Sequence, residues 1–260
     1  MVPETCDRII LSGTLFLIVF APLAYGGVDV WAVNLIRAVV VLMFGAWLIK
    51  AAYLRDFRFT YPPFWAPALL FLLLLAFQLV PIPVSWRVFL SPEPLRHSIL
   101  LPSSPAPLEE LSLRNWTQLT LYPPATWDGL LDLSTCLALC WILLNSLSAI
   151  KRGQFIMGAL IVVGFFEAIY SLVEYWSGRQ GIFWFIKVYY REGATGTYIN
   201  HNHFAGLLEM IIPLAIGGLW LRFQAGFGKG QSTSETDRLG HWKTVGLALS
   251  LAVMLVALIL

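Results

Sequence analysis

Charged residues are scarce in this sequence: Asp, Glu, Lys and Arg make up 12% of its 260 residues, against 58% hydrophobic residues. So little charge excludes an ordinary soluble domain. The formal net charge is only +2, which gives no reason to expect a nucleic-acid partner. Cysteine is scarce as well, and the three cysteines suggest neither a disulfide framework nor a metal cluster. We expect Cys136 and Cys140, one helical turn apart, to pack in the protein interior.

Long apolar runs dominate the rest of the sequence. They are continuous over roughly 17 to 25 residues, which is the length of a transmembrane helix, and they lack the period of two that barrel strands show. We therefore expect an all-α, polytopic transmembrane helix bundle with about seven spans, forming a single membrane domain over residues 1–260. The predicted spans are residues 9–25, 30–49, 64–80, 129–148, 155–176, 204–221 and 243–260.

Lysine and arginine are unevenly distributed between the two sides of these spans. If the N-terminus is cytoplasmic, the cytoplasmic segments carry more of them than the longer segments on the other side, as the positive-inside rule requires. Two loops then face away from the cytoplasm. Residues 81–128 form a proline-rich loop that we expect to lie irregularly over the outer face, with Thr126 as a candidate N-cap of the next span. Residues 177–203 include an aromatic series at 183–190, which predicts either an interfacial anchor or a platform for sugar stacking.

The most polar stretch of the chain, residues 191–206, stands directly before an apolar run. Its hydrogen-bonding groups are costly to desolvate at the mouth of a membrane helix unless they bind something. The helix that starts near Phe204 also directs its free N–H groups and the positive end of its dipole to this place, which suits a phosphate. An alternative is that Thr197, Asn200 and Asn202 only cap the helix and end an interfacial loop. The candidate ligands of a diphosphate or substrate are Lys187, Arg191, Thr197, Asn200, His201, Asn202 and His203.

Two of these candidates, His201 and His203, also invite a metal interpretation. A zinc site needs three or four protein ligands, however, and the chain offers only two further histidines, His97 and His241. His241 is predicted on the opposite side of the membrane. We therefore expect no metal and no cofactor, and we assign His201 and His203 to hydrogen bonds with phosphate or hydroxyl groups, or to simple interfacial placement.

Four charged residues fall inside the predicted spans: Arg37, Glu167, Glu174 and Glu209. Each costs about 2.5 to 3.5 kcal/mol if it faces lipid at the bilayer centre, so we expect them to face the bundle interior and to pair or line a wet cavity. A structural bridge between Arg37 and Glu167 accounts for that pair. Glu174 and Glu209 lie nearer the outer face and are candidates for a functional cavity.

Residues 196–215, with the sequence GTYINHNHFAGLLEMIIPLA, resemble the signature that opens the core domain of the bacterial O-antigen ligase and O-antigen polymerase family. In that family a Gly-Thr-aromatic-x-Asn-x-Asn-x-Phe-Ala pattern precedes a membrane helix. Residues 121–130, with a Pro-x-x-Thr element before a span, are also similar to members of the family. On this resemblance, residues 196–260 would be the start of the core domain, and Arg191, Asn200 and Asn202 would match the phosphate-contacting arginine and the asparagines of the family.

The resemblance implies a membrane glycosyltransferase of lipopolysaccharide or exopolysaccharide assembly in the bacterial inner membrane. Such enzymes transfer a glycan from undecaprenyl diphosphate to a lipid A core sugar, another glycan or another acceptor at the periplasmic face. The diphosphate leaving group activates the donor, so no nucleotide is needed, and we expect a metal-independent reaction.

Members of the family continue for several more spans and a large periplasmic loop. This sequence stops at Leu260 inside a predicted span, so we expect a fragment or a shortened relative whose main catalytic base lies beyond residue 260. Two other hypotheses stay open: a non-catalytic membrane module that binds polyprenyl phosphate, and a transporter. The transporter is weakened because the sequence has no recognisable internal repeat.

Overall fold

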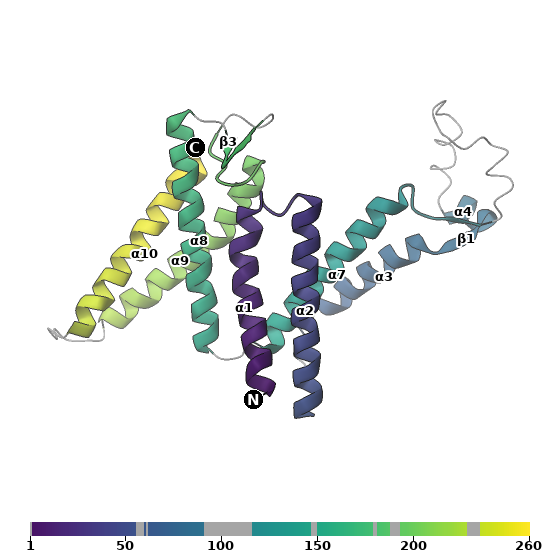
Figure 1. The fold of residues 1–260 in the computed structure, drawn as a ribbon, viewed down its shortest axis with the longest axis horizontal. Helices are drawn as coiled ribbons and strands as arrows, with labels where there is room; N and C mark the ends of the chain where they lie inside the picture. Colours follow the sequence, from purple (N-terminus) through teal and green to yellow (C-terminus); the bar gives the residue numbers. More distant parts are fainter. Residues whose placement is uncertain are drawn as a thin grey trace. The chain divides into compact units, whose positions relative to one another are not determined.

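The structure is a computed structural model that describes residues 2–55, 60, 62–90, 116–146, 150–178, 181–187, 193–227 and 235–260. Over these residues the chain forms eight helices and two short two-stranded sheets (Figure 1). The predicted all-α architecture is therefore confirmed.

Six of the described helices are long and apolar enough to cross a membrane. A seventh apolar helix, α3 (Trp65–Leu79), has only 15 residues, which gives about 22 Å of length against about 30 Å of hydrocarbon thickness. The third predicted span is thus a helix, but a short one. The six long helices are α1 (Val2–Leu23), α2 (Val30–Leu54), α7 (Pro123–Ser146), α8 (Ile150–Ser177), α9 (His201–Phe227) and α10 (Glu235–Ile259).

The described residues divide into two compact units. Unit 1 comprises residues 1–56 and 146–260 and contains α1, α2, α8, α9 and α10. In unit 1, α1 packs along α2 and also contacts α8 (Figure 1). The three helices α8, α9 and α10 pack on one another. Large apolar side chains such as Phe204, Leu208, Ile211 and Met254 fill the core between these last three helices.

Unit 2 comprises residues 57–145 and shows that the proline-rich loop is not irregular throughout. Strand β1 (Pro81–Pro83) pairs antiparallel with β2 (Trp116–Gln118), with Ile82 opposite Thr117, and helix α4 (Val84–Leu90) follows β1 directly. The prediction of an irregular segment is wrong at these two ends. Proline has no N–H to donate to a neighbouring strand. Strand β1 has a single partner, so it tolerates proline at the positions whose N–H would not be hydrogen-bonded.

Two smaller predictions in unit 2 are also corrected. Helix α7 begins at Pro123, which suits the first helical position because proline has no N–H to leave unpaired, so Thr126 lies inside the helix instead of capping it. The Thr126 hydroxyl is 2.6 Å from the Thr120 hydroxyl. Cys136 is exposed and Cys140 is half-buried, because few side chains of this unit cover that part of α7; Cys6, on α1, is the buried cysteine.

Charged side chains tie three helices of unit 1 together at the end that holds the N-terminus of α1. Asp7 of α1 binds Lys50 of α2 at 2.5 Å and Arg152 of α8 at 3.0 Å. Arg152 also donates to the backbone oxygen of Ser146 at 3.2 Å. One carboxylate therefore links α1, α2 and α8 where the apolar segments end.

Candidate functional site at the start of α9

The residues predicted to carry function gather at the opposite end of unit 1, in residues 193–200 and the first turn of α9. We call residues 193–200 the motif loop. Asn200 is the N-cap of α9: its side-chain oxygen accepts the N–H of Asn202 at 2.9 Å, and its backbone oxygen accepts the N–H groups of His203 and Phe204 at 3.1 and 3.3 Å. The predicted capping role is thus confirmed for Asn200. His201, Asn202 and His203 expose their side chains in the first turn.

Thr197 is buried and fixes the motif loop to two helices. Its N–H donates to Glu167 Oε2 of α8 at 2.9 Å, and its hydroxyl lies 2.7 Å from Glu167 Oε1 and 2.8 Å from the backbone oxygen of Pro22 in α1. Both Glu167 and Thr197 are fully buried. Thr197 therefore positions the loop and does not present its hydroxyl to a ligand.

The Thr197 hydroxyl has one proton and two close oxygen neighbours, Pro22 O and Glu167 Oε1. The Pro22 carbonyl and an ionised Glu167 carboxylate both only accept, so they share the single Thr197 proton. Each of the two contacts has a proton of its own only if the Glu167 carboxyl is protonated and donates to Thr197, while Thr197 donates to Pro22.

Two glycines with positive φ allow the motif loop to approach its neighbours this closely. Gly196 has φ +60°, and a Cβ there would stand 2.6 Å from Glu167 Oε2. Gly26, in the turn after α1, has φ +75°, and a Cβ there would stand 2.5 Å from the ring of Tyr198. Both positions therefore require glycine, for conformation and for space. Burial raises the pKa of Tyr198, so its phenol keeps its proton at neutral pH and is no general base.

Lys187 is fully buried, although its charge suggested a diphosphate ligand. Its ammonium group forms an ion pair with Glu174 of α8 and a hydrogen bond with the Thr195 hydroxyl, which itself lies 3.3 Å from the second Glu174 oxygen. The hairpin of β3 (Gly181–Ile182) and β4 (Phe185–Ile186) returns the chain so that Lys187 reaches Glu174. Lys187 and Glu174 neutralise each other here, and the ammonium group is not exposed to a ligand.

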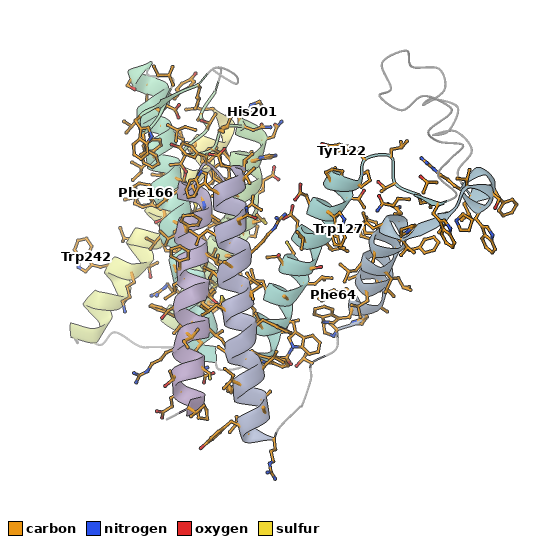
Figure 2. All side chains as sticks on the ribbon, turned by 45° about the vertical axis from the view of Figure 1, so that its right-hand side comes forward. Phe64, Tyr122, Trp127, Phe166, His201 and Trp242 are labelled. Carbon is orange, nitrogen blue, oxygen red and sulfur yellow. The ribbon has the colours of Figure 1, made fainter. Side chains whose placement is uncertain are left out.

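A cavity of about 450 Å³ opens beside the motif loop. It lies between the start of α9 and the end of α10, and His201 is the polar side chain among its lining residues. Figure 2 shows His201 at this end of unit 1. Its lining residues are Gly193, Ala194, His201, Phe204, Ala205, Ala257, Leu258, Ile259 and Leu260.

Of the remaining predicted residues, Arg191 is outside the described residues. Arg37 is half-buried and donates to Asn34 at 3.3 Å, whereas Glu167 binds Thr197, so the expected bridge between Arg37 and Glu167 is replaced by other partners. Glu209 is exposed, because the face of α9 that packs in the core carries its neighbour Leu208 instead; the expectation that Glu209 faces the interior is wrong.

The aromatic series at residues 183–190 is described only as far as residue 187. The Phe183 ring packs on Tyr170 at 5.4 Å between ring centres, and the Phe183 N–H donates to the Tyr170 hydroxyl at 2.7 Å. Trp184 is exposed at the tip of the β3–β4 hairpin. The choice between an interfacial anchor and a sugar platform stays a prediction.

Within the described part of the chain, no three His, Cys, Asp or Glu side chains come together in a way that could hold a metal ion. Comparison with family models, curated proteins and solved structures finds no match for this chain.

Proposed function

We propose that this protein takes part in the transfer of a glycan from undecaprenyl diphosphate to a lipid A core sugar, a glycan or another acceptor. The observation that carries the proposal is the position of residues 196–206, whose sequence resembles the O-antigen ligase and polymerase signature. They form a rigidly held loop and helix start beside a cavity with mainly apolar walls. The site would face the periplasm of the bacterial inner membrane, with the N-terminus of the chain in the cytoplasm.

The chemistry of the cavity supports a lipid diphosphate as the donor. Phe204, Ala257 and Leu258 suit the isoprenoid chain, and His201 supplies a hydrogen-bonding side chain beside them. The positive end of the α9 dipole lies at the same place and favours a phosphate. Arg191, by its position just before the motif loop, would neutralise the departing diphosphate.

The proposed reaction forms one bond and breaks one. An acceptor hydroxyl oxygen bonds to the anomeric carbon of the donor glycan, the bond from that carbon to the phosphate oxygen breaks, and undecaprenyl diphosphate leaves with the electron pair. The hydroxyl proton passes to a general base that we do not assign to a residue of this chain. The motif loop would hold the donor in place while the acceptor approaches.

A transfer assay tests the proposal. The full chain is placed in vesicles with an undecaprenyl-diphosphate-linked glycan and an acceptor glycan, and the transferred product is measured. We expect Arg191→Ala to reduce transfer at least tenfold, as removal of a charged hydrogen bond of about 1.5–3 kcal/mol predicts, while Arg222→Ala, which removes an exposed cation at the other end of α9, leaves it unchanged. Equal activity of the Arg191 variant and the wild type would remove Arg191 from the site.

A second candidate function is a non-catalytic module that binds polyprenyl phosphate. It is favoured because His201 is the one titratable side chain among the described residues that line the cavity. Binding of undecaprenyl phosphate without any transfer in the same vesicles would select this function. Movement of the lipid-linked glycan across the vesicle membrane without transfer would instead indicate a transporter.

A further inference from the structure

A second cavity lies at the other end of unit 1, between α1 and α2. It is a groove of about 500 Å³ that runs along the two antiparallel helices. Gly13 of α1 brings them together, since a Cβ there would stand 2.6 Å from the sulfur of Met43 in α2. The groove is lined by Thr5, Arg8, Ile9, Ser12, Gly13 and Phe16 of α1 and by Val39, Leu42 and Met43 of α2.

The lining residues of α1 form one stripe whose polarity changes along the helix. Thr5, Arg8 and Ser12 follow one another at intervals of three and four residues and occupy the end near the N-terminus of α1. Phe16, with Val39 from α2, makes the other end apolar. The distance from Arg8 to Phe16 along the axis is about 12 Å, at 1.5 Å per residue.

Arg8 differs from the other cations at this end of unit 1. Lys50 and Arg152 both bind Asp7, the residue next to Arg8. Arg8 itself is exposed and has no carboxylate partner in the part of the chain that the structure describes. The apolar run of α1 begins at the next residue, so Arg8 lies at the level where an apolar helix meets lipid headgroups.

We propose that the groove between α1 and α2 binds an anionic phospholipid. The Arg8 guanidinium and the Ser12 hydroxyl would hold the phosphate, and one acyl chain would lie along Gly13 toward Phe16 and Val39. Arginine presents a planar set of donors that matches phosphate oxygens. The groove accepts a chain because its walls beyond Ser12 are apolar and open to the hydrocarbon region.

Selectivity among lipids must come from the headgroup. An acyl chain gains little by leaving the bilayer for an apolar groove, because the surrounding lipid tails are equally apolar. One cation near the surface strengthens binding of an anionic lipid about fivefold. The groove therefore distinguishes phosphatidylglycerol from phosphatidylcholine mainly through Arg8.

Native mass spectrometry of the purified full chain with an equimolar mixture of phosphatidylglycerol and phosphatidylcholine tests this site. The wild type should retain phosphatidylglycerol preferentially, and Arg8→Gln should reduce that preference about fivefold. Arg222→Gln is the matched control, since it removes an exposed cation from α9, a helix that does not line the groove, and should leave the preference unchanged. An equal loss in both variants, or no loss in either, would overturn the proposal.

A photoreactive phosphatidylglycerol with a diazirine on its acyl chain then locates the lipid. Cross-links are expected within residues 9–16 and 39–43, and Ser12→Phe should abolish them while circular dichroism shows unchanged helix content. An excess of inorganic phosphate should not displace the label, because a free anion lacks the acyl chain; displacement would show that only an anion site exists. Cross-links confined to other helices would refute the site.

Discussion

The hydrogen bonds of Glu167 make a specific prediction about its protonation. In Glu167→Gln the amide oxygen can accept the Thr197 N–H, and the amide NH₂ can donate to the Thr197 hydroxyl, which still donates to Pro22. If Glu167 is normally protonated, every bond survives and the free energy of unfolding changes by less than about 1 kcal/mol. In Glu167→Ala the Thr197 N–H is left buried and unpaired, which costs about 1–3 kcal/mol.

These energies convert to a measurable shift in melting temperature. At about 2–4 °C per kcal/mol for a chain of this size, Glu167→Ala should melt about 2–12 °C below the wild type, and Glu167→Gln close to it. A thiol-reactive fluorescent dye reports the transition through Cys6, which is buried in α1, once Cys136 and Cys140 are replaced by serine. Glu209→Ala serves as the control, because Glu209 is exposed and its loss should not alter melting.

The comparison of the two Glu167 variants refutes the reasoning if glutamine is as destabilising as alanine. That result would mean that the native carboxyl is ionised and that the bond pattern drawn from the Thr197 hydroxyl is wrong. Equal melting of all three proteins would mean that Glu167 does not hold the motif loop at all.

Two further predictions concern residues that contact the motif loop. Gly26→Ala should destabilise the protein by at least about 1–2 kcal/mol, because alanine is strained at positive φ and its Cβ would strike the Tyr198 ring. Gly45→Ala is the control and should be neutral or stabilising, because the space around its Cβ is open. Equal melting temperatures of the two variants would contradict this prediction. Lys187→Met should lower the free energy of unfolding by about 3–5 kcal/mol, because it leaves Glu174 buried without its cation. Adding Glu174→Gln should restore most of that stability. A double variant no more stable than Lys187→Met would show that the two residues are not coupled.

The helices were predictable from the sequence because hydropathy is a local signal. The continuous apolar run over residues 30–49, for example, became α2 with little change at its start. Helix ends were less predictable. Helix α1 begins at Val2 and not at residue 9. The polar residues before the apolar run extend the helix outside the hydrocarbon region, where they have no desolvation cost. The first turn of α9 was missed for the same reason, because His201 and Asn202 are polar.

The partners of the buried charges could not be predicted because they depend on distant parts of the chain. Glu167 binds a residue thirty positions away, and the Thr197 hydroxyl reaches back to Pro22. Lys187 looked like a surface cation, but the β3–β4 hairpin returns it to Glu174, and no glycine or asparagine at the turn residues Phe183 and Trp184 marks that hairpin in the sequence. The Gly196-Thr197 pair was the one sequence feature that pointed to the contact with Glu167, since a small residue followed by a hydroxyl suits close packing on a buried carboxyl.

The position of the motif loop relative to the membrane is the point on which the proposed function depends. Asn202 has an exposed side chain in the first turn of α9, so a cysteine there is accessible to reagents. We would label Asn202→Cys, in a background without the native cysteines, with a membrane-impermeant maleimide in intact bacterial cells whose outer membrane has been made permeable. Labelling in these intact cells is the expected result, because the donor diphosphate would be bound on the periplasmic side. Labelling that requires rupture of the inner membrane would place the start of α9 in the cytoplasm and contradict the proposed site.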